Sequence, residues 1–151
     1  MSIAFETSAQ VRFAHIDAAG IVFYPRYLEM LNGAVEDWCE NALGVTFREM
    51  HHERQIGVPT VKLQVDFTAP SRLGDRLSIE LTPKKLGRSS CNLDIRFACE
   101  GEVRLQAQVV LVCMDLESQR STAWPEDMRL RIHESMTLER FPITLDRSRR
   151  S

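Results

Sequence analysis

The second half of the chain contains four successive stretches in which apolar and polar residues alternate, and this period of two limits the possible folds more than any other feature. The stretches are 61–67, 77–81, 91–97 and 103–111. Alternation puts every second side chain on the same face, so each stretch is expected to be a strand with one face on a core. Short connections between such runs, including the loop at 70–75, favour antiparallel neighbours.

One long helical pattern precedes these strands. Five apolar residues recur at spacings of three and four, which makes one continuous stripe on a helix. Pro25 suits the first helical position and Gly44 suits the left-handed position beyond the last turn, so the helix is expected over residues 25–43. The stripe consists of Leu28, Leu31, Val35, Trp38 and Ala42.

Two shorter helices are also predicted. Thr46 and Glu49 have the spacing of a capping box, which would open a short helix that the turn at 55–57 ends. Residues 124–128 resemble another helix start, because acidic residues lie where the helix dipole favours negative charge.

The order of these elements predicts an α+β fold in which the helix and an antiparallel sheet of about five strands are segregated. A chain of 151 residues has room for one domain, here placed at 1–140 with a flexible tail at 141–151. The helix can cover only one face of the sheet. Because Val110, Val112 and Met114 add apolar character to the other face, self-association is expected to cover it.

Charge and composition exclude several classes of function. The 19 basic and 21 acidic residues give a net charge of -2, which disfavours binding to nucleic acid or an anionic membrane. The longest apolar stretch, 109–114, is too short to span a bilayer, and no secretion signal opens the chain, so a cytoplasmic location is expected. The four cysteines form no C-x-x-C pair, which favours reduced thiols over disulfides or zinc.

The loop before the long helix is the best place for chemistry. Asp17 lies there, followed by two alanines and Gly20, which allow a substrate to approach the backbone. The free N–H groups of a helix N-terminus can polarise a carbonyl, and a nearby carboxylate can attack an acyl carbon or deprotonate water. The alternative is that Asp17 is only a turn or cap residue.

Other reactive residues offer weaker sites. His15 precedes Asp17 by two residues and can form a hydrogen bond to it. A metal site is not expected, because the sequence offers no third ligand beside this pair. The segment 51–53, His-His-Glu, is interpreted as a solvated surface. Cys91 and Cys113 have inward strand positions with no histidine nearby in sequence, and there is no G-x-S-x-G motif, so neither a catalytic thiol nor that kind of serine hydrolase is expected.

Residues 15–27, HIDAAGIVFYPRY, resemble the D-x-x-G-h-V-(aromatic)-x-x-x-Y signature of the 4-hydroxybenzoyl-CoA thioesterase family. The segments 65–70, 73–75 and 86–90 follow in the order and spacing of that family, so the resemblance covers about residues 8 to 130. It implies a hotdog fold, in which an antiparallel sheet wraps a long helix. It further implies hydrolysis of acyl-CoA thioesters without a metal or organic cofactor, by homodimers or homotetramers.

The resemblance also assigns roles to individual residues. Asp17 would be the catalytic nucleophile or general base, and the backbone N–H of Tyr24 would polarise the carbonyl. The substrate would contact Gly20 and Asn32, and its CoA end would lie near a basic, hydroxyl-rich segment. That segment comprises Lys85, Arg88, Ser89 and Ser90. Arginine and hydroxyl groups can bind phosphate through charge-assisted hydrogen bonds.

Two positions bear on the acyl group, and other functions stay open. Pro25 matches the aryl-CoA branch of the family, whereas Asn32 replaces the acid of 4-hydroxybenzoyl-specific members, so aryl and short or medium acyl groups are both retained. The alternatives are a thioesterase for acyl-carrier protein and a non-catalytic acyl-CoA-binding protein. A hotdog dehydratase is disfavoured because a motif such as Gly-His-Phe-Pro is missing from the sequence.

Overall fold

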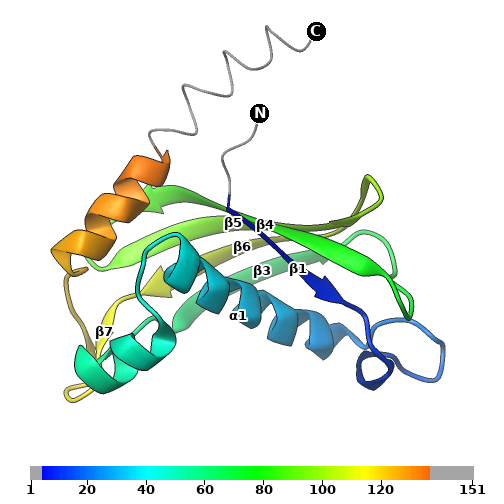
Figure 1. Ribbon diagram of the computed structural model, residues 1–151, viewed down its shortest axis with the longest axis horizontal. Coiled ribbons are helices and arrows are strands. Elements are labelled where there is room, and N and C mark those ends of the chain that lie inside the picture. Colours follow the sequence, from blue (N-terminus) through cyan, green and yellow to red (C-terminus); the bar gives the residue numbers. More distant parts are fainter. Residues whose placement is uncertain (1–4, 137–151) are drawn as a thin grey trace, which may run out of the picture.

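The computed structural model describes residues 5–136, and in it a five-stranded antiparallel sheet curves around one long helix (Figure 1). The predicted α+β hotdog fold is therefore confirmed. The predicted tail at 141–151 lies outside the described residues. No helix in the described part of the chain is long and apolar enough to cross a membrane.

The long helix, α1 (Tyr24–Asn41), begins one residue before and ends two residues before the predicted limits. Phe23 precedes it in an extended conformation, and Pro25 lies in the first turn, where no N–H partner is needed. After the helix, Gly44 adopts a φ of 79°, as its predicted left-handed position requires. The helix buries one face against the sheet, through Tyr27, Leu31, Ala34, Val35, Trp38 and Cys39.

The main sheet has the strand order β1-β4-β5-β6-β3. Its strands are β1 (Phe5–Gln10), β3 (Thr60–Phe67), β4 (Arg76–Leu86), β5 (Ser90–Cys99) and β6 (Glu102–Val112). All four predicted alternating stretches form strands. The predicted turn at Glu100 and Gly101 connects β5 to β6, and both residues have positive φ, as a tight two-residue hairpin requires.

The expectation that the strands on either side of the loop 70–75 are neighbours is wrong. β3 pairs with β6, whereas β4 lies between β1 and β5. The connection of residues 68–75 therefore crosses the ends of β6 and β5, a span of about 14 Å at the usual spacing between strands. Eight residues reach that far easily, so the short loop length did not enforce a hairpin.

Strand β4 also continues through residues 84–86, which the sequence pattern had separated from the strand. Pro83 lies within it at a register irregularity between Pro83 and Lys85. Among the described residues, β1 pairs with β4 only as far as Leu81, so the missing N–H of Pro83 leaves no gap in the hydrogen bonds between these strands.

The remaining elements are short helices and a small second sheet. The predicted second helix is a short π-helical segment, η2 (Glu49–Glu53), and Thr46 Oγ1 accepts from the Glu49 N–H at 3.0 Å, as one half of a capping box. A second sheet, which the sequence did not predict, joins β2 (Ile56–Gly57), β7 (Met114–Asp115) and β8 (Arg120–Ser121). The predicted C-terminal helix covers residues 126–136.

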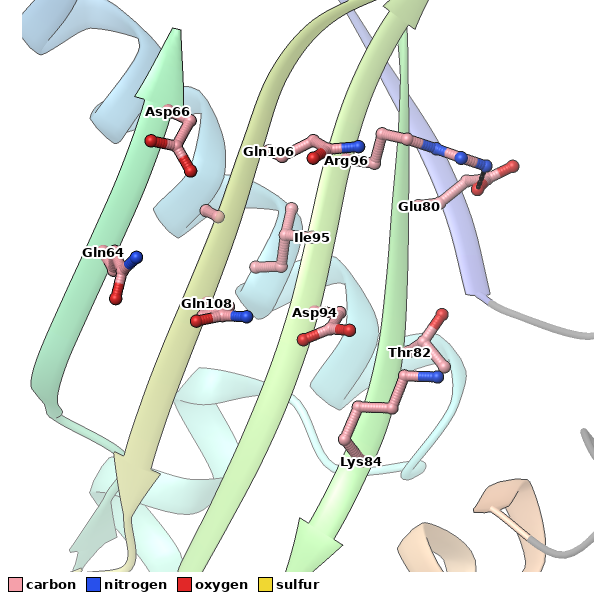
Figure 2. Close-up of a pocket in the computed structure, with 11 residues that line it drawn as sticks. Gln64, Asp66, Glu80, Thr82, Lys84, Asp94, Ile95, Arg96, Gln106 and Gln108 are labelled. Carbon is pink, nitrogen blue, oxygen red and sulfur yellow. Dashed lines mark hydrogen bonds and ion pairs between the residues drawn. The ribbon is translucent and has the colours of Figure 1, made fainter.

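The two faces of the main sheet differ sharply in chemistry. The inner face packs against α1, whereas the outer face carries charged and amide side chains across four strands (Figure 2). They surround a hollow of about 340 Å³ lined by Gln64, Asp66, Glu80, Thr82, Lys84, Asp94, Ile95, Arg96, Gln106, Ala107 and Gln108. Self-association was expected to cover an apolar outer face, but most of this face is polar, so its apolar residues do not call for a partner.

Candidate functional site

Asp17 lies in a small hairpin that ends where α1 begins. An isolated bridge pairs Ile16 with Val22, the Asp17 N–H donates to the Ile21 carbonyl (3.0 Å), and the Gly20 N–H donates to the Asp17 carbonyl (2.9 Å). Gly20 has a φ of 82°, which favours glycine in this turn. One carboxylate oxygen of Asp17 accepts from the Ala19 N–H at 2.8 Å. The carboxylate is exposed and held by its own turn.

The helix start lies directly after this hairpin. Phe23 is fixed by its N–H bond to the His15 carbonyl (2.9 Å), and the Arg26 N–H donates to the Phe23 carbonyl (2.8 Å). Tyr24 is the first residue of α1, so its N–H belongs to the group that has no partner within a helix. The hairpin thus brings a carboxylate and a helix N-terminus into one short segment, as the sequence predicted.

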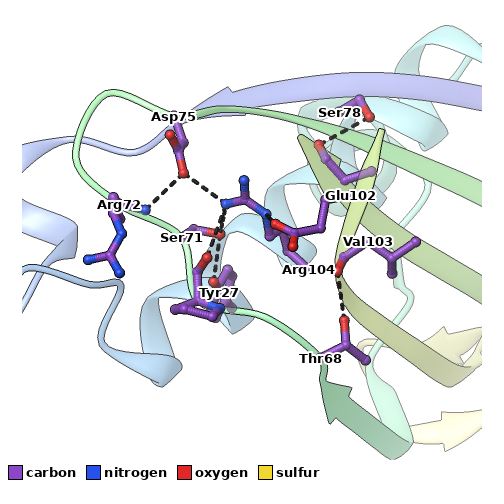
Figure 3. Close-up of polar contacts among 11 residues, drawn as sticks. Tyr27, Thr68, Ser71, Arg72, Asp75, Ser78, Glu102, Val103 and Arg104 are labelled. Atoms are coloured by element: carbon purple, nitrogen blue, oxygen red, sulfur yellow. Dashed lines mark hydrogen bonds and ion pairs between the residues drawn. The ribbon is translucent and has the colours of Figure 1, made fainter. Parts of the chain in front are cut away.

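A second loop supports this segment from the other side (Figure 3). The Val22 N–H donates to the Ser71 carbonyl at 2.9 Å. The buried Tyr27 hydroxyl donates to Ser71 Oγ at 2.8 Å, and Arg104 Nη1 donates to Ser71 Oγ (3.1 Å) and to Asp75 (2.8 Å). The Arg72 N–H and the Arg104 guanidinium hold the pKa of Asp75 below its usual value. This polar network fixes the first turn of α1 to the loop.

Aromatic side chains surround the helix start. Tyr24 packs edge-on against both Phe23 and Phe67, with ring centroids 5.7 and 6.1 Å apart, and Tyr27 contacts Phe67 at 5.8 Å. Phe23, Tyr24 and Phe67 are 47%, 60% and 49% exposed. Such exposed aromatic faces can receive an apolar or aromatic group.

The basic, hydroxyl-rich segment forms the β4–β5 hairpin at the opposite end of the sheet (Figure 1). Its backbone is well anchored, since the Gly87 N–H donates to the Ser90 carbonyl (2.8 Å) and the Cys113 N–H to the Ser89 carbonyl (2.7 Å). A Cβ at Gly87 would lie 2.6 Å from Ser90 Oγ, so a larger residue there would require the Ser90 hydroxyl to rotate away. Arg88 is exposed, whereas Ser89 and Ser90 are half-buried.

The C-terminal segment adds a residue that sequence reasoning missed. Trp124 donates through its backbone N–H to the Arg88 carbonyl (3.1 Å) and through its indole N–H to the Ser90 carbonyl (3.1 Å). Arg129 Nη1 donates to the Gly87 carbonyl at 2.9 Å. The Arg129 guanidinium therefore lies at the same hairpin as Arg88, and it reaches this position only because the helix at 126–136 packs there.

The structure does not gather all of the predicted site residues. Asp17, Gly20 and Tyr24 lie together, but the hairpin with Arg88 lies beyond the far end of β4, whose eleven residues span about 35 Å. Asn32 is exposed on α1, about 12 Å along the helix from Tyr24. Lys85 lines a second outer-face hollow of about 240 Å³. Neither this hollow nor the larger one includes Asp17 or Tyr24.

Other reactive groups are placed away from this chemistry. His15 Nδ1 accepts from the Arg12 N–H (2.8 Å), so its ring is engaged there and not with Asp17. Burial raises the pKa of Cys39 and Cys91 to about 12, which keeps both thiols protonated at neutral pH. Among the described residues, no group of three or more His, Cys, Asp or Glu side chains has an arrangement that could hold a metal ion.

Known proteins resemble the chain over most of its length. The model of the thioesterase-like superfamily matches residues 11–132. A 1,4-dihydroxy-2-naphthoyl-CoA hydrolase from Synechococcus elongatus is 30% identical over 79% of this chain and 88% of its own. The corresponding hydrolase from Synechocystis is 28% identical over 81% and 89% of the two chains.

Solved structures agree with these relatives. The crystal structure of a 1,4-dihydroxy-2-naphthoyl-CoA thioesterase from Synechocystis has a TM-score of 0.78 at 25% identity, and covers 87% of this chain and 96% of its own. BH1999 gentisyl-coenzyme A thioesterase has a TM-score of 0.76 at 26% identity, and covers 85% and 99%. A Staphylococcus aureus protein solved with CoA shares the fold, with a TM-score of 0.82 at 17% identity over 89% of this chain and 84% of its own.

These relatives confirm the prediction of a thioester hydrolase, while the assignment to the 4-hydroxybenzoyl-CoA branch is not confirmed. The matched segment begins just before the Asp17 hairpin and ends within the C-terminal helix, so it includes both parts of the candidate site. The chain belongs to the thioesterase-like superfamily, whose hotdog fold it shares.

Proposed function

We propose that this protein hydrolyses acyl-CoA thioesters and that Asp17 carries the chemistry. The observation that carries the proposal is the hairpin itself, which joins the exposed Asp17 carboxylate to the N-terminus of α1 within one hydrogen-bonded segment. Thioester hydrolysis needs a nucleophile or base on one side of the carbonyl and a donor for its oxygen on the other. Asp17 and the Tyr24 N–H are groups of these two kinds.

The proposed reaction breaks the C–S bond of the thioester and uses water as the only co-reactant. Asp17 either attacks the carbonyl carbon to form an acyl-enzyme anhydride, which water then hydrolyses, or removes a proton from the attacking water. In both routes the Tyr24 N–H donates to the carbonyl oxygen as negative charge develops there. The products are the free acid and the thiol of CoA, and no metal or organic cofactor takes part.

The acyl group is proposed to be aromatic. Phe23, Tyr24 and Phe67 expose their rings at the helix start, which suits edge or offset packing against an aryl ring. The related 1,4-dihydroxy-2-naphthoyl-CoA and gentisyl-coenzyme A thioesterases act on aryl thioesters, which supports this choice.

The CoA phosphates are proposed to bind at the β4–β5 hairpin. Arg88 and Arg129 supply positive charge, and Ser89 and Ser90 supply hydroxyl donors. The pantetheine arm of CoA is too short to connect this hairpin to Asp17 of the same chain, because about 35 Å of β4 separates them. We therefore propose that each site combines the Asp17 hairpin of one protomer with the β4–β5 hairpin of its partner.

The free edge of β3 is the proposed contact between the two copies. This strand carries Val61 and Leu63 with 60% and 41% exposure on the same side as the exposed Phe67, and the edge opposite β6 pairs with no strand among the described residues. An exposed edge strand with apolar side chains is a template for pairing with another chain. The protein is thus proposed to be a homodimer, or a tetramer built from such dimers.

The experiment measures thiol release from acetyl-, hexanoyl-, benzoyl-, 4-hydroxybenzoyl- and 1,4-dihydroxy-2-naphthoyl-CoA, with the unmodified protein beside Asp17→Asn. We expect the highest kcat/KM for aryl thioesters and a loss of about 10² to 10⁴-fold in the variant. Equal rates for the two proteins would refute the role of Asp17. Background release from every CoA ester would instead favour an acyl-carrier-protein substrate or a binding function, which acylated carrier protein and CoA binding would then distinguish.

A further inference from the structure

His15 connects the segment after β1 to the segment that opens α1. Its backbone N–H donates to the Arg12 carbonyl at 2.9 Å, and its carbonyl accepts from the Phe23 N–H at 2.9 Å. Its ring also takes part, because Nδ1 accepts from the Arg12 N–H at 2.8 Å. The residue thus closes the Asp17 hairpin at its base and ties it to the strand before it.

Hydrogen bonds hold the short turn before Ile16, because the turn itself buries none of its residues. The short 3-10 turn η1 (Phe13–His15) contains no buried residue, and Phe13 is 79% exposed. The nearest buried side chains are those of Val11 and Val22 on either side. Removing the ring acceptor would leave the turn held only by backbone bonds, with the Arg12 N–H deprived of its partner.

We propose that His15 is a positioning residue, whose Nδ1 acceptor keeps the Asp17 carboxylate and the Tyr24 N–H in a fixed relation. The inference rests on the proposed function, since it concerns the geometry of those two groups. Nδ1 can accept only when the ring proton is on Nε2, so the neutral imidazole is the form that holds the turn. A displacement of about 1 Å at a catalytic group can lower the rate by about 10²-fold.

Three substitutions separate this role from a direct contact with substrate. The side-chain oxygen of asparagine can take the place of Nδ1, whereas the longer side chain of glutamine puts its polar group near the place of Nε2. We expect His15→Ala and His15→Gln to lower kcat for the preferred thioester by about tenfold or more with KM nearly unchanged. His15→Asn should restore most of kcat. Rescue by glutamine and not by asparagine would overturn the proposal in favour of a role for Nε2.

Amide hydrogen exchange at Arg12 tests the same bond without substrate. We expect protection of the Arg12 N–H in the unmodified protein and in His15→Asn, and faster exchange in His15→Gln and His15→Ala. Equal protection in all four would overturn the inference even if Asp17→Asn is inactive. Conversely, an active Asp17→Asn would refute the proposed function while the Arg12 exchange still reports on His15. Thermal unfolding identifies any variant that fails to fold. If His15→Ala fails, the comparison of His15→Asn with His15→Gln still shows whether an acceptor at the place of Nδ1 is required.

Discussion

The two ends of strand β4 carry different halves of the candidate site, and they are built in different ways. At one end, Asp17 and Tyr24 lie in a hairpin and a first helical turn that are neighbours in sequence. At the other end, Arg88 lies in a hairpin whose surroundings, including Trp124 and Arg129, come from a segment more than thirty residues away. The proposed catalytic groups are therefore close together in sequence, whereas the proposed phosphate site is assembled by tertiary packing.

Neither outer-face hollow of the chain contains Asp17 or Tyr24. The larger hollow lies on the polar outer face of the sheet, away from Asp17 and Tyr24. In the proposed site, a substrate bound at one end takes the other end from a second copy, and the exposed apolar residues Val61 and Leu63 along β3 form the proposed contact.

The largest expected effect comes from combining defects at the two ends. Asp17→Asn alone should lower kcat by about 10² to 10⁴-fold. At substrate concentrations below KM, a mixed dimer of Asp17→Asn and Arg88→Ala should show about half of the kcat/KM of the unmodified protein, because one of its two sites then combines intact hairpins from both protomers. Activity of differently tagged, co-purified mixed dimers measures this. A kcat/KM no higher than that of the Arg88→Ala homodimer would mean that both ends act within one chain.

The next largest effect concerns the contact between copies. Leu63→Asp should weaken the dimer by at least about tenfold, since it replaces an apolar side chain by a charge at the proposed interface. Gln64→Asp is the matched control, because the next residue of the same strand faces the polar hollow. Sedimentation velocity over a range of concentrations gives the two dissociation constants. Equal constants would exclude the β3 edge as the interface.

A smaller effect isolates the phosphate end. Arg88→Ala should raise KM for the CoA ester by about tenfold with little change in kcat, because a charge-assisted hydrogen bond far from the reacting carbonyl is lost. Arg96→Ala is the control, since Arg96 lies on the outer face and pairs with Glu80 at 2.7 Å. Steady-state kinetics at two salt concentrations checks both. A fall in kcat alone would contradict a role in phosphate binding.

The smallest effect concerns the network that supports the chemical end. The pKa of Asp75 is lowered by the Arg72 N–H and by Arg104, so its ionised form contributes stability above the ordinary carboxyl pKa of about 3.9. That contribution is lost as pH falls through the lower folded value. Asp75→Asn should therefore cost about 1 kcal/mol at neutral pH and less near pH 3. Urea unfolding at both pH values measures the difference, and a constant difference would rule out this linkage.

Much of the fold was predictable because its signals are short in sequence. The helical stripe around Leu31 and Trp38 and the alternation in the four strands each report which side of one element is apolar, and both were confirmed. The neighbour assignment across residues 70–75 failed for the same reason. Alternation shows which face of a strand is buried but does not say which strand lies beside it.

In the candidate site, too, residues that are close in sequence were predicted, whereas contacts made by tertiary packing were not. Asp17, Gly20 and Tyr24 were brought together as expected, because the turn and helix start at residues 17–24 determine their relative positions. Arg129 could not have been found, since nothing near it in sequence points to the β4–β5 hairpin. The His15 ring bonds to Arg12 and not to Asp17, which depends on the 3-10 turn that places the Arg12 N–H beside it.

The sequence by itself determined the long helix, the four long strands, the α+β class and the segment that presents Asp17, because each depends on residues that are close together in the chain. Only the tertiary structure decided the strand order, the position of Arg129 and the separation of Asp17 from Arg88 along β4. The physical reason is that packing energy depends on which distant apolar faces meet, and many pairings of the same elements satisfy the local pattern equally well.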